Sequence, residues 1–303
     1  MVLIAVLGLL SLLMFVTLQF AADTTFTTQY YTTMRDGEKA YYMATSIAGS
    51  ALMLIKFDQG SSDSLKSLWA QRFPVMKVDE GLVELSIEDE ERKFNPNAMV
   101  DAAGKMDDKH FKQFRLLLKL LRANDDFAGA VLDWIDVDDT RTLPGGAELS
   151  DYAEHPCKNA PLDSVEEVLL VKGCAKEDYM GKIGGRDYLP GLKEMLTAHS
   201  SGKININTAN RFILMSLDSS ITEEMANEVI RRRYDTPFKD LNGLLEVTGF
   251  NSDIIYRIGA LADTKSEYFR MKVRASVGET TTYLTAIYKK DGSDFNPVYW
   301  KVD

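Results

Sequence analysis

The chain has 303 residues, of which 45% are hydrophobic, and a formal net charge of −10. This content suffices for a folded core and about two domains, and the acidic balance argues against a protein that mainly neutralises nucleic-acid phosphates. The two cysteines and three scattered histidines are too few, and unsuitably spaced, for a disulfide-built scaffold or a zinc site.

Residues 1–22 contain no charged side chain. A helix of this length rises about 1.5 Å per residue and therefore spans the roughly 30 Å hydrocarbon core of a bilayer. A secretory signal differs from this segment, because it has a basic start and a shorter apolar run. We therefore expect one membrane-spanning helix. Either the protein starts abruptly inside this hydrophobic segment, or a basic leader has been removed on its amino side. Met1 is then the processed N-terminus, and the residues from about Asp23 onward lie outside the cytoplasm.

Beyond Ala22 the helical pattern continues and becomes amphipathic. Apolar, aromatic and small residues recur every three or four positions, at Phe26, Tyr30, Met34, Gly37, Tyr41, Ala44, Ala48, Ala51 and Ile55. This spacing predicts that the second half of the helix leaves the bilayer and packs the stripe against a water-soluble domain. The break at residues 60–63 predicts where the helix ends.

Alternating apolar and polar residues predict strands on both sides of a long helical region. The strands cover residues 81–88, 268–277, 280–288 and 298–302, and the helical pattern lies between residues 101 and 263. A helical domain inserted into a small sheet explains this order better than two domains in tandem, so the predicted fold class is α+β. The predicted parts are a transmembrane segment (1–22), the amphipathic helix with the first strands (23–100), the inserted helical domain (101–263) and the C-terminal strands (264–303).

The inserted region contains an internal repeat. Lys93–Ala98 matches Lys203–Ala209, Pro161–Leu169 matches Pro237–Leu245, and a glycine turn follows the second motif of each copy at Gly173 and Gly249. We therefore expect two small helical bundles of similar design. The first copy carries an extra stretch that the second lacks.

That extra stretch, residues 136–154, is strongly acidic. It holds one arginine, Arg141, and six acids, Asp136, Asp138, Asp139, Glu148, Asp151 and Glu154. Such a loop is either solvated or neutralised by a cation, and oxygen ligands without His or Cys suit calcium. The spacing is not that of an EF-hand, so the residues alone leave a solvated acidic loop and a calcium site both open.

Several features of the sequence resemble those of a known protein family. The uncharged start followed by a long amphipathic helix is similar to type IV pilins and type II secretion pseudopilins after removal of their leader. Ordinary members have Glu at the fifth mature position, whereas Ala5 stands here, as in the K-type minor pseudopilins. Four internal motifs carry the same resemblance: Phe94–Asn97, Asp133–Asp136 with Gly146–Glu148, Pro161–Glu167 and Ile204–Ala209.

The resemblance implies a pilin-like fold, with a long helix and an antiparallel sheet into which a large helical domain is inserted. It implies a non-enzymatic subunit of the bacterial inner membrane, with most of the chain in the periplasm. It also implies a place at the tip of the pseudopilus, bound to the I- and J-type minor pseudopilins. A fifth-position carboxylate is thought to pair with the N-terminal amine of a neighbouring subunit. The side chain of Ala5 has no carboxylate, and a subunit without this group suits the first, capping position of a filament.

Calcium binding in the inserted domain is a further implication of the resemblance. We carry it over to the acidic loop, where the candidate ligands are Asp136, Asp138, Asp139, Glu148 and Asp151. No catalytic residue, small-molecule substrate or nucleic-acid partner is expected.

The two cysteines are predicted to pair, because the compartment implied by the topology is oxidising. A disulfide between Cys157 and Cys174 closes a loop with 16 residues between them and contributes about 3 kcal/mol if unstrained. Two buried free thiols are the alternative.

Two functions of other classes are alternatives to this one. The glycine-terminated hairpins at Val171–Gly173 and Val247–Gly249 resemble helix-hairpin-helix DNA modules, and Arg231–Arg233 is the basic run that favours this interpretation. A membrane-anchored calcium-dependent hydrolase would use Asp133 or Asp136 with His155. Neither is favoured, because the surroundings of the first hairpin are acidic and no nucleophile elbow, phosphate loop or zinc signature is present.

Overall fold

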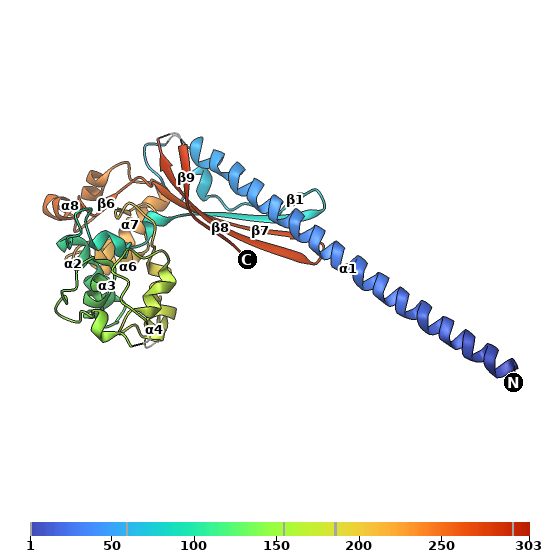
Figure 1. Cartoon of the computed structure of the whole chain (residues 1–303). Helices are drawn as coiled ribbons and strands as arrows, with labels where there is room; N and C mark the ends of the chain where they lie inside the picture. The colour runs from blue at the N-terminus through green and yellow to red at the C-terminus, as the bar shows by residue number, and fades with distance from the viewer. Residues whose placement is uncertain (1, 59, 154, 185–186, 293) are drawn as a thin grey trace.

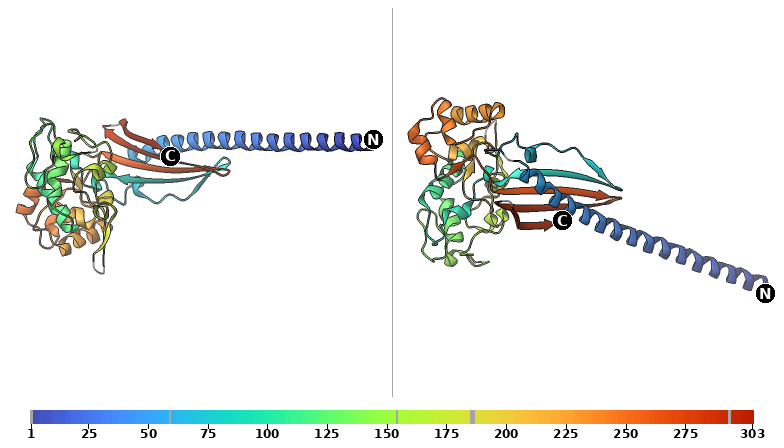
Figure 2. Two further views of the ribbon diagram at one scale, coloured as in Figure 1. Left: turned by 60° about the horizontal axis from the view of Figure 1, so that its bottom comes forward. Right: turned by 90° about the horizontal axis from the view of Figure 1, so that it is seen from above.

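We describe residues 2–58, 60–153, 155–184, 187–292 and 294–303 in a computed structural model. A 55-residue helix, α1 (Val2–Lys56), runs from the N-terminus and crosses one face of a sheet. Its first part projects beyond the sheet, and the helical insert lies at the opposite end of the molecule (Figure 1). Two further views show the same arrangement from other sides (Figure 2).

The sheet has five strands in the order β1-β2-β7-β8-β9, and all neighbouring strands are antiparallel. The strands are β1 (Met76–Val78), β2 (Gly81–Asp89), β7 (Tyr268–Val277), β8 (Thr280–Asp291) and β9 (Asp294–Val302). The insert separates β2 from β7 in sequence, yet they pair along their whole length, from Gly81 opposite Val277 to Asp89 opposite Phe269. The predicted strands are confirmed, with β1 and the first residues of β9 in addition.

Small residues form the face of α1 that packs on the sheet. Ala40, Ala44, Ala48 and Ala51 are buried, and Ile55 closes the row at the end of the helix. Short side chains let the helix backbone approach β7 and β8 closely. The predicted stripe is therefore confirmed from Ala44 onward.

The earlier part of the predicted stripe does not pack on the sheet. Phe26, Tyr30 and Met34 are exposed, because they precede Asp36, the first buried residue of α1. Tyr41 is 40% exposed, because the buried row continues through Ala40 instead. Along its uncovered length, α1 thus presents aromatic and apolar side chains outward.

The insert is built from short helices and turns. Its α-helices are α2 (Asp108–Leu120), α3 (Phe127–Ile135), α4 (Lys176–Met180), α5 (Leu192–Met195), α6 (Arg211–Ser216), α7 (Glu223–Asp235) and α8 (Ser252–Ile258). The 3₁₀ helices of the chain are η1 (Leu68–Ala70), η2 (Glu90–Arg92), η3 (Pro96–Met99), η4 (Leu149–Asp151), η5 (Val165–Leu170) and η6 (Leu241–Glu246). The helical pattern did not predict two short strand pairs, β3 (Lys182–Gly184) with β4 (Asp187–Leu189), and β5 (Ile204–Asn205) with β6 (Ala262–Asp263).

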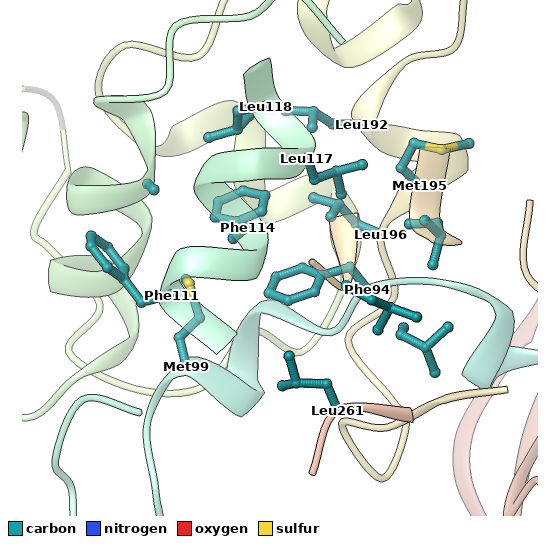
Figure 3. Packing of buried hydrophobic residues seen from close by; sticks show 14 of the residues in the cluster. Phe94, Met99, Phe111, Phe114, Leu117, Leu118, Leu192, Met195, Leu196 and Leu261 are labelled. Carbon is teal, nitrogen blue, oxygen red and sulfur yellow. The ribbon is translucent and has the colours of Figure 1, made fainter. Parts of the chain in front are cut away.

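The core of the insert forms around α2. Phe114 and Leu117 of α2 are fully buried, and the ring of Phe114 stacks on that of Phe94 with centroids 5.1 Å apart. Leu196 and Leu261 reach the same core from later segments of the chain (Figure 3). This core is distinct from the one between α1 and the sheet.

The two copies of the predicted repeat make matching hydrogen bonds. In the first copy, the Asn97 side chain donates to the carbonyl of Leu162 (3.0 Å) and accepts from its backbone N–H (2.7 Å). In the second, the Asn207 side chain donates to the carbonyl of Phe238 (2.8 Å) and accepts from its N–H (2.9 Å). Each asparagine therefore fastens the second motif of its copy to the first.

Each copy also turns at its glycine in the same way. Gly173 follows η5 with a φ of +91°, and Gly249 follows η6 with a φ of +97°. Side chains rarely adopt this left-handed region, which explains glycine at both turns.

Candidate metal centre

The acidic loop folds back against α3, the most buried helix of the insert. Gly145 and Gly146 allow this close approach. A Cβ atom on Gly145, where φ is +88°, would lie 2.0 Å from the carbonyl oxygen of Asp126. One on Gly146 would lie 2.4 Å from Oδ2 of Asp133. Only glycine fits at these two positions.

Asp133 of α3 fixes the returning loop. Its Oδ1 and Oδ2 accept from the backbone N–H of Thr142, at 3.0 and 3.2 Å. The side chain is fully buried, and this burial raises the pKa of Asp133. The loop is thereby held over the C-terminal end of α3, where Asp136 follows the last helical residue.

Three carboxyl groups converge at that end of α3. We call Asp136, Asp138 and Glu148 the acidic cluster, in which one oxygen of each lies within 4.8 Å of the other two. Asp136 and Glu148 are 7% and 6% exposed, and Asp138 is exposed. Oδ1 of Asp136 and both carboxylate oxygens of Glu148 are buried, and no described group donates a hydrogen bond to them. Buried acceptors without a donor are costly unless a cation or proton binds them.

The pKa values of Asp136 and Glu148 agree with this burial of carboxylates without donors. Burial, followed by repulsion from Asp138 and Asp133, raises the pKa of Asp136 to about 7. Burial and the neighbouring acids, Asp133 first, raise the pKa of Glu148 to about 7 as well. The site therefore favours uptake of positive charge.

The cluster includes three of the five predicted ligands. Asp151 is held elsewhere: it accepts from Arg141 and from Nζ of Lys172 (2.8 Å), and the hydrogen bond from Lys172 is the main reason that its pKa is lowered. Asp139 accepts from the side chain of Asn159 at 3.1 Å. Glu154, the sixth acid of the loop, lies outside the described residues.

Asp133 was not predicted as a ligand, although it lies beside the cluster. Its position three residues before Asp136, near the end of α3, was the available signal, because it brings the two side chains to the same end of one helix. A centre made only of carboxylate oxygens fits a hard cation such as calcium, and the donorless oxygens of Asp136 and Glu148 supply free coordination positions.

The cysteines are free thiols in the structure, which contradicts the predicted disulfide. Sγ of Cys157 lies in the core, 3.5 Å from the carbonyl oxygen of Asp133. Sγ of Cys174 lies 3.9 Å from the carbonyl oxygen of Ala175, and burial raises its pKa to about 11. Both sulfur atoms thus contact backbone carbonyls.

The residues of the nucleic-acid alternative have partners within the chain. Arg231 and Arg232 form ion pairs with Glu228 and Glu246. Arg233 is buried and donates to the carbonyl of Ile206 at 2.6 Å. The three arginines therefore do not form a free phosphate-binding patch.

The residue of the hydrolase alternative is held among aromatic rings. His155 lies edge-on to the ring of Trp134, with centroids 5.6 Å apart, and its ring also contacts that of Tyr152. Its Nδ1 lies 3.4 Å from the carbonyl oxygen of Pro156. Packing against these aromatic rings therefore explains a histidine at position 155 without a catalytic role.

At the other end of the molecule, α1 is the helix of the described residues that is long and apolar enough to cross a membrane. Ala5 lies within it, on its uncovered part. Met1, the predicted processed N-terminus, lies outside the described residues.

Comparisons with known proteins identify this architecture. A family model described as "Type II secretion system (T2SS), protein K" matches residues 92–181, which include the acidic cluster. The chain is 24% identical over 276 residues to the type II secretion system protein K of Aeromonas hydrophila, a match that covers 83% of this chain and 81% of that protein. The predicted resemblance to the K-type minor pseudopilins is confirmed.

The fold of the chain also matches a solved structure. The crystal structure of the GspK-GspI-GspJ complex of the enterotoxigenic Escherichia coli type 2 secretion system contains a chain that superposes with a TM-score of 0.75. The two chains are 19% identical, and the match covers 92% of this chain and 99% of the other. The predicted α+β fold with a long N-terminal helix and an antiparallel sheet is confirmed.

Proposed function

We propose that this K-type minor pseudopilin is a structural subunit at the tip of the pseudopilus of a type II secretion system. In this proposal residues 1–22 hold it in the inner membrane, and the remainder of the chain lies in the periplasm. Its role is to start or cap the filament, and it catalyses no reaction.

The observation that supports this role is the position of the insert. The uncovered part of α1 leaves one end of the molecule, and the insert occupies the other (Figure 1). A filament of pilin-like subunits grows by packing such helices side by side. Other subunits thus have access to α1 from the N-terminal end, whereas the bulk of the insert obstructs a further layer beyond the sheet.

The partners we propose are the I- and J-type minor pseudopilins. The related chain in the solved structure is part of a complex with proteins of these two types, as its name states. On α1 of this chain, Tyr30, Tyr31 and Met34 are exposed and apolar or aromatic, which suits helix packing between subunits.

The test is to place a label on the insert and locate it on isolated pseudopili. We expect one label at one end of each filament, and co-purification of the full-length protein in detergent with both minor pseudopilins. Regular labelling along the shaft would contradict a tip position, and normal secretion after deletion of the gene would contradict a role in the system.

We further propose that the acidic cluster binds calcium as a structural ion. The donorless oxygens of Asp136 and Glu148 support this proposal. Binding to the folded state alone raises stability by RT ln(1 + [Ca²⁺]/Kd), about 2.7 kcal/mol at a hundredfold excess over Kd. Thermal melts of the full-length protein in calcium, magnesium and chelator test it, and identical melting in calcium and chelator would reduce the loop to a solvated acidic surface.

A further inference from the structure

Three consecutive acids are buried where the chain leaves the sheet for the insert. Asp89 ends β2, and Glu90 and Glu91 begin η2. They are 1%, 0% and 1% exposed. Three ionised carboxylates in such a place require compensation, because burial without a partner charge or hydrogen bonds is costly.

The middle acid is compensated by cations. Glu90 forms ion pairs with Lys93 (3.0 Å) and Arg270 (2.9 Å), and its carboxylate also accepts from the hydroxyl of Thr197. These partners outweigh burial, so the pKa of Glu90 is lowered. Glu90 is therefore an ionised carboxylate.

Asp89 and Glu91 are compensated differently. Neither forms an ion pair with a described cation, and the two residues are in direct contact, because the backbone N–H of Glu91 donates to Oδ1 of Asp89 at 2.8 Å. Two neighbouring carboxylates that are buried without a cation repel each other. One proton bound by the pair removes this repulsion.

The pair also connects the two parts of the molecule. On the insert side, Oδ2 of Asp89 accepts from the side chains of Asn205 (3.1 Å) and Thr208 (2.5 Å). Oε1 of Glu91 accepts from the backbone N–H of Ser201 at 3.2 Å. On the sheet side, Oε2 of Glu91 accepts from the N–H of Tyr268, the first residue of β7, at 3.1 Å.

Other charged groups around the pair have partners of their own. Asp63 accepts from the N–H of Ser266, and Lys203 pairs with Asp263. The charged or titratable residues next to the pair in sequence, or on the segments that lie against it, include Asp63, Glu88, Glu90, Arg92, Lys93, His199, Lys203, Asp263, Tyr268, Arg270, Lys272 and Arg274. Lys93 and Arg270 pair with Glu90, and Lys203, Lys272 and Arg274 pair with Asp263, Glu88 and Glu84. No ion pair joins a described cation to Asp89 or Glu91.

We propose that Asp89 and Glu91 share one proton and that this proton fastens the insert to the sheet. Loss of the proton places two carboxylates in contact in a buried site, so it loosens the connections from Ser201, Asn205 and Thr208 to the sheet. The orientation of the insert relative to α1 thereby depends on pH.

The direction in which folding stability changes with pH follows from the environment of each carboxyl group. Burial, and then the charge of Asp89, raise the pKa of Glu91 well above its ordinary value of 4.5. A proton bound more tightly in the folded chain than in the unfolded chain stabilises the fold, and this stabilisation falls as the pH rises from about 4.5 through the folded pKa. Glu90, whose pKa is lowered, has the opposite sign: its contribution is present above about 4.5 and is lost at lower pH.

The experiment compares two neighbouring substitutions in the full-length protein in detergent. Glu91→Gln keeps a group that donates to Asp89 but carries no exchangeable charge, and Glu90→Gln is the matched control at an equally buried position. At neutral pH, infrared difference spectra against wild type should show the loss of one protonated-carboxyl band in Glu91→Gln and no such loss in Glu90→Gln. Asp136 and Glu148 are common to all three proteins and cancel in the difference spectra.

Melting temperatures measured between pH 4 and 9 give the second readout. The advantage of wild type over Glu91→Gln should shrink as the pH rises above about 4.5, whereas its advantage over Glu90→Gln should stay constant there and fall only at lower pH. Slopes of the same sign for both variants, or an unchanged carboxyl band in Glu91→Gln, would overturn the proposal. If Glu91→Gln does not fold, Asp89→Asn serves instead, because replacing the acceptor of the proton should shift the same band, and a band that stays in place contradicts the pair.

Discussion

Asp136 and Glu148 show how single residues can be arranged for an ion. Each is more than 90% buried and has an oxygen without a donor among the described groups. Asp151, in the same loop, has two cationic partners. The difference between these acids is local geometry, which composition and spacing do not contain.

This difference gives a prediction for Asp136→Asn. Calcium should raise the melting temperature of the wild-type protein and leave that of the variant nearly unchanged, because the variant loses a charged ligand. Without calcium, the variant should be at least as stable as wild type, because repulsion among the acids falls. Calorimetry with and without chelator measures both effects. Asp151→Asn is the matched control, and loss of the calcium response in this control instead would place the ion elsewhere in the loop.

The cysteines give a second prediction at this scale. Because both are free thiols, a thiol reagent added to the unfolded, unreduced protein should modify Cys157 and Cys174, two groups per chain. Mass spectrometry counts the added groups. A chain that takes up label only after reduction would restore the disulfide predicted from the compartment.

At the scale of elements, the repeat is maintained by Asn97 and Asn207. Asn207→Ala removes two buried hydrogen bonds to Phe238 and leaves its N–H and carbonyl without a partner. We expect a loss of about 2–4 kcal/mol in the free energy of unfolding, and a similar loss for Asn97→Ala. Denaturant titration measures it. Asn242→Ala, at an exposed position, should stay within about 0.5 kcal/mol of wild type. An equal loss in this variant would show that the hydrogen bonds of Asn97 and Asn207 do not contribute more to stability than an exposed side chain does.

Elements with a strong period were predictable, and those set by tertiary contact were not. The alternation in residues 81–88 identified β2, and the three-to-four spacing identified α1. The pairing of β5 with β6 involves two residues on each side and has no periodic signal. Tyr41 was assigned to the buried face of α1, because its spacing fits the stripe, whereas close packing on the sheet selects the smaller Ala40.

The sequence predicts which loop holds the candidate metal centre, but not which of its acids come together. A net negative, glycine-containing stretch indicated the place. The choice of Asp136, Asp138 and Glu148 depends on the return of the loop over α3, which the contacts of Gly145 and Gly146 allow.

For the whole molecule, the decisive variant is Ala5→Glu. Ala5 lies near the N-terminal end of α1, and this end projects away from the sheet and the insert (Figure 1), so melting of the folded part should not change. An unpaired carboxylate in the membrane costs roughly 2 to 3 kcal/mol on insertion scales, or becomes protonated, so secretion should be unchanged or reduced. Secretion assays and quantification of the protein in membranes measure this. A clear gain in secretion would mean that the subunit has a neighbour ready to pair with the acid, as in a shaft.

The pairing of β2 with β7 has a consequence for folding. Asp89 and Phe269 are opposite each other, although residues 90–268 separate them in sequence. Bringing two such distant strands together in an unfolded chain carries a large loop-closure entropy, whereas a folded insert holds its two ends side by side. We therefore expect the insert to fold first and to act as the template on which the sheet closes, so that α1 finds its packing surface last.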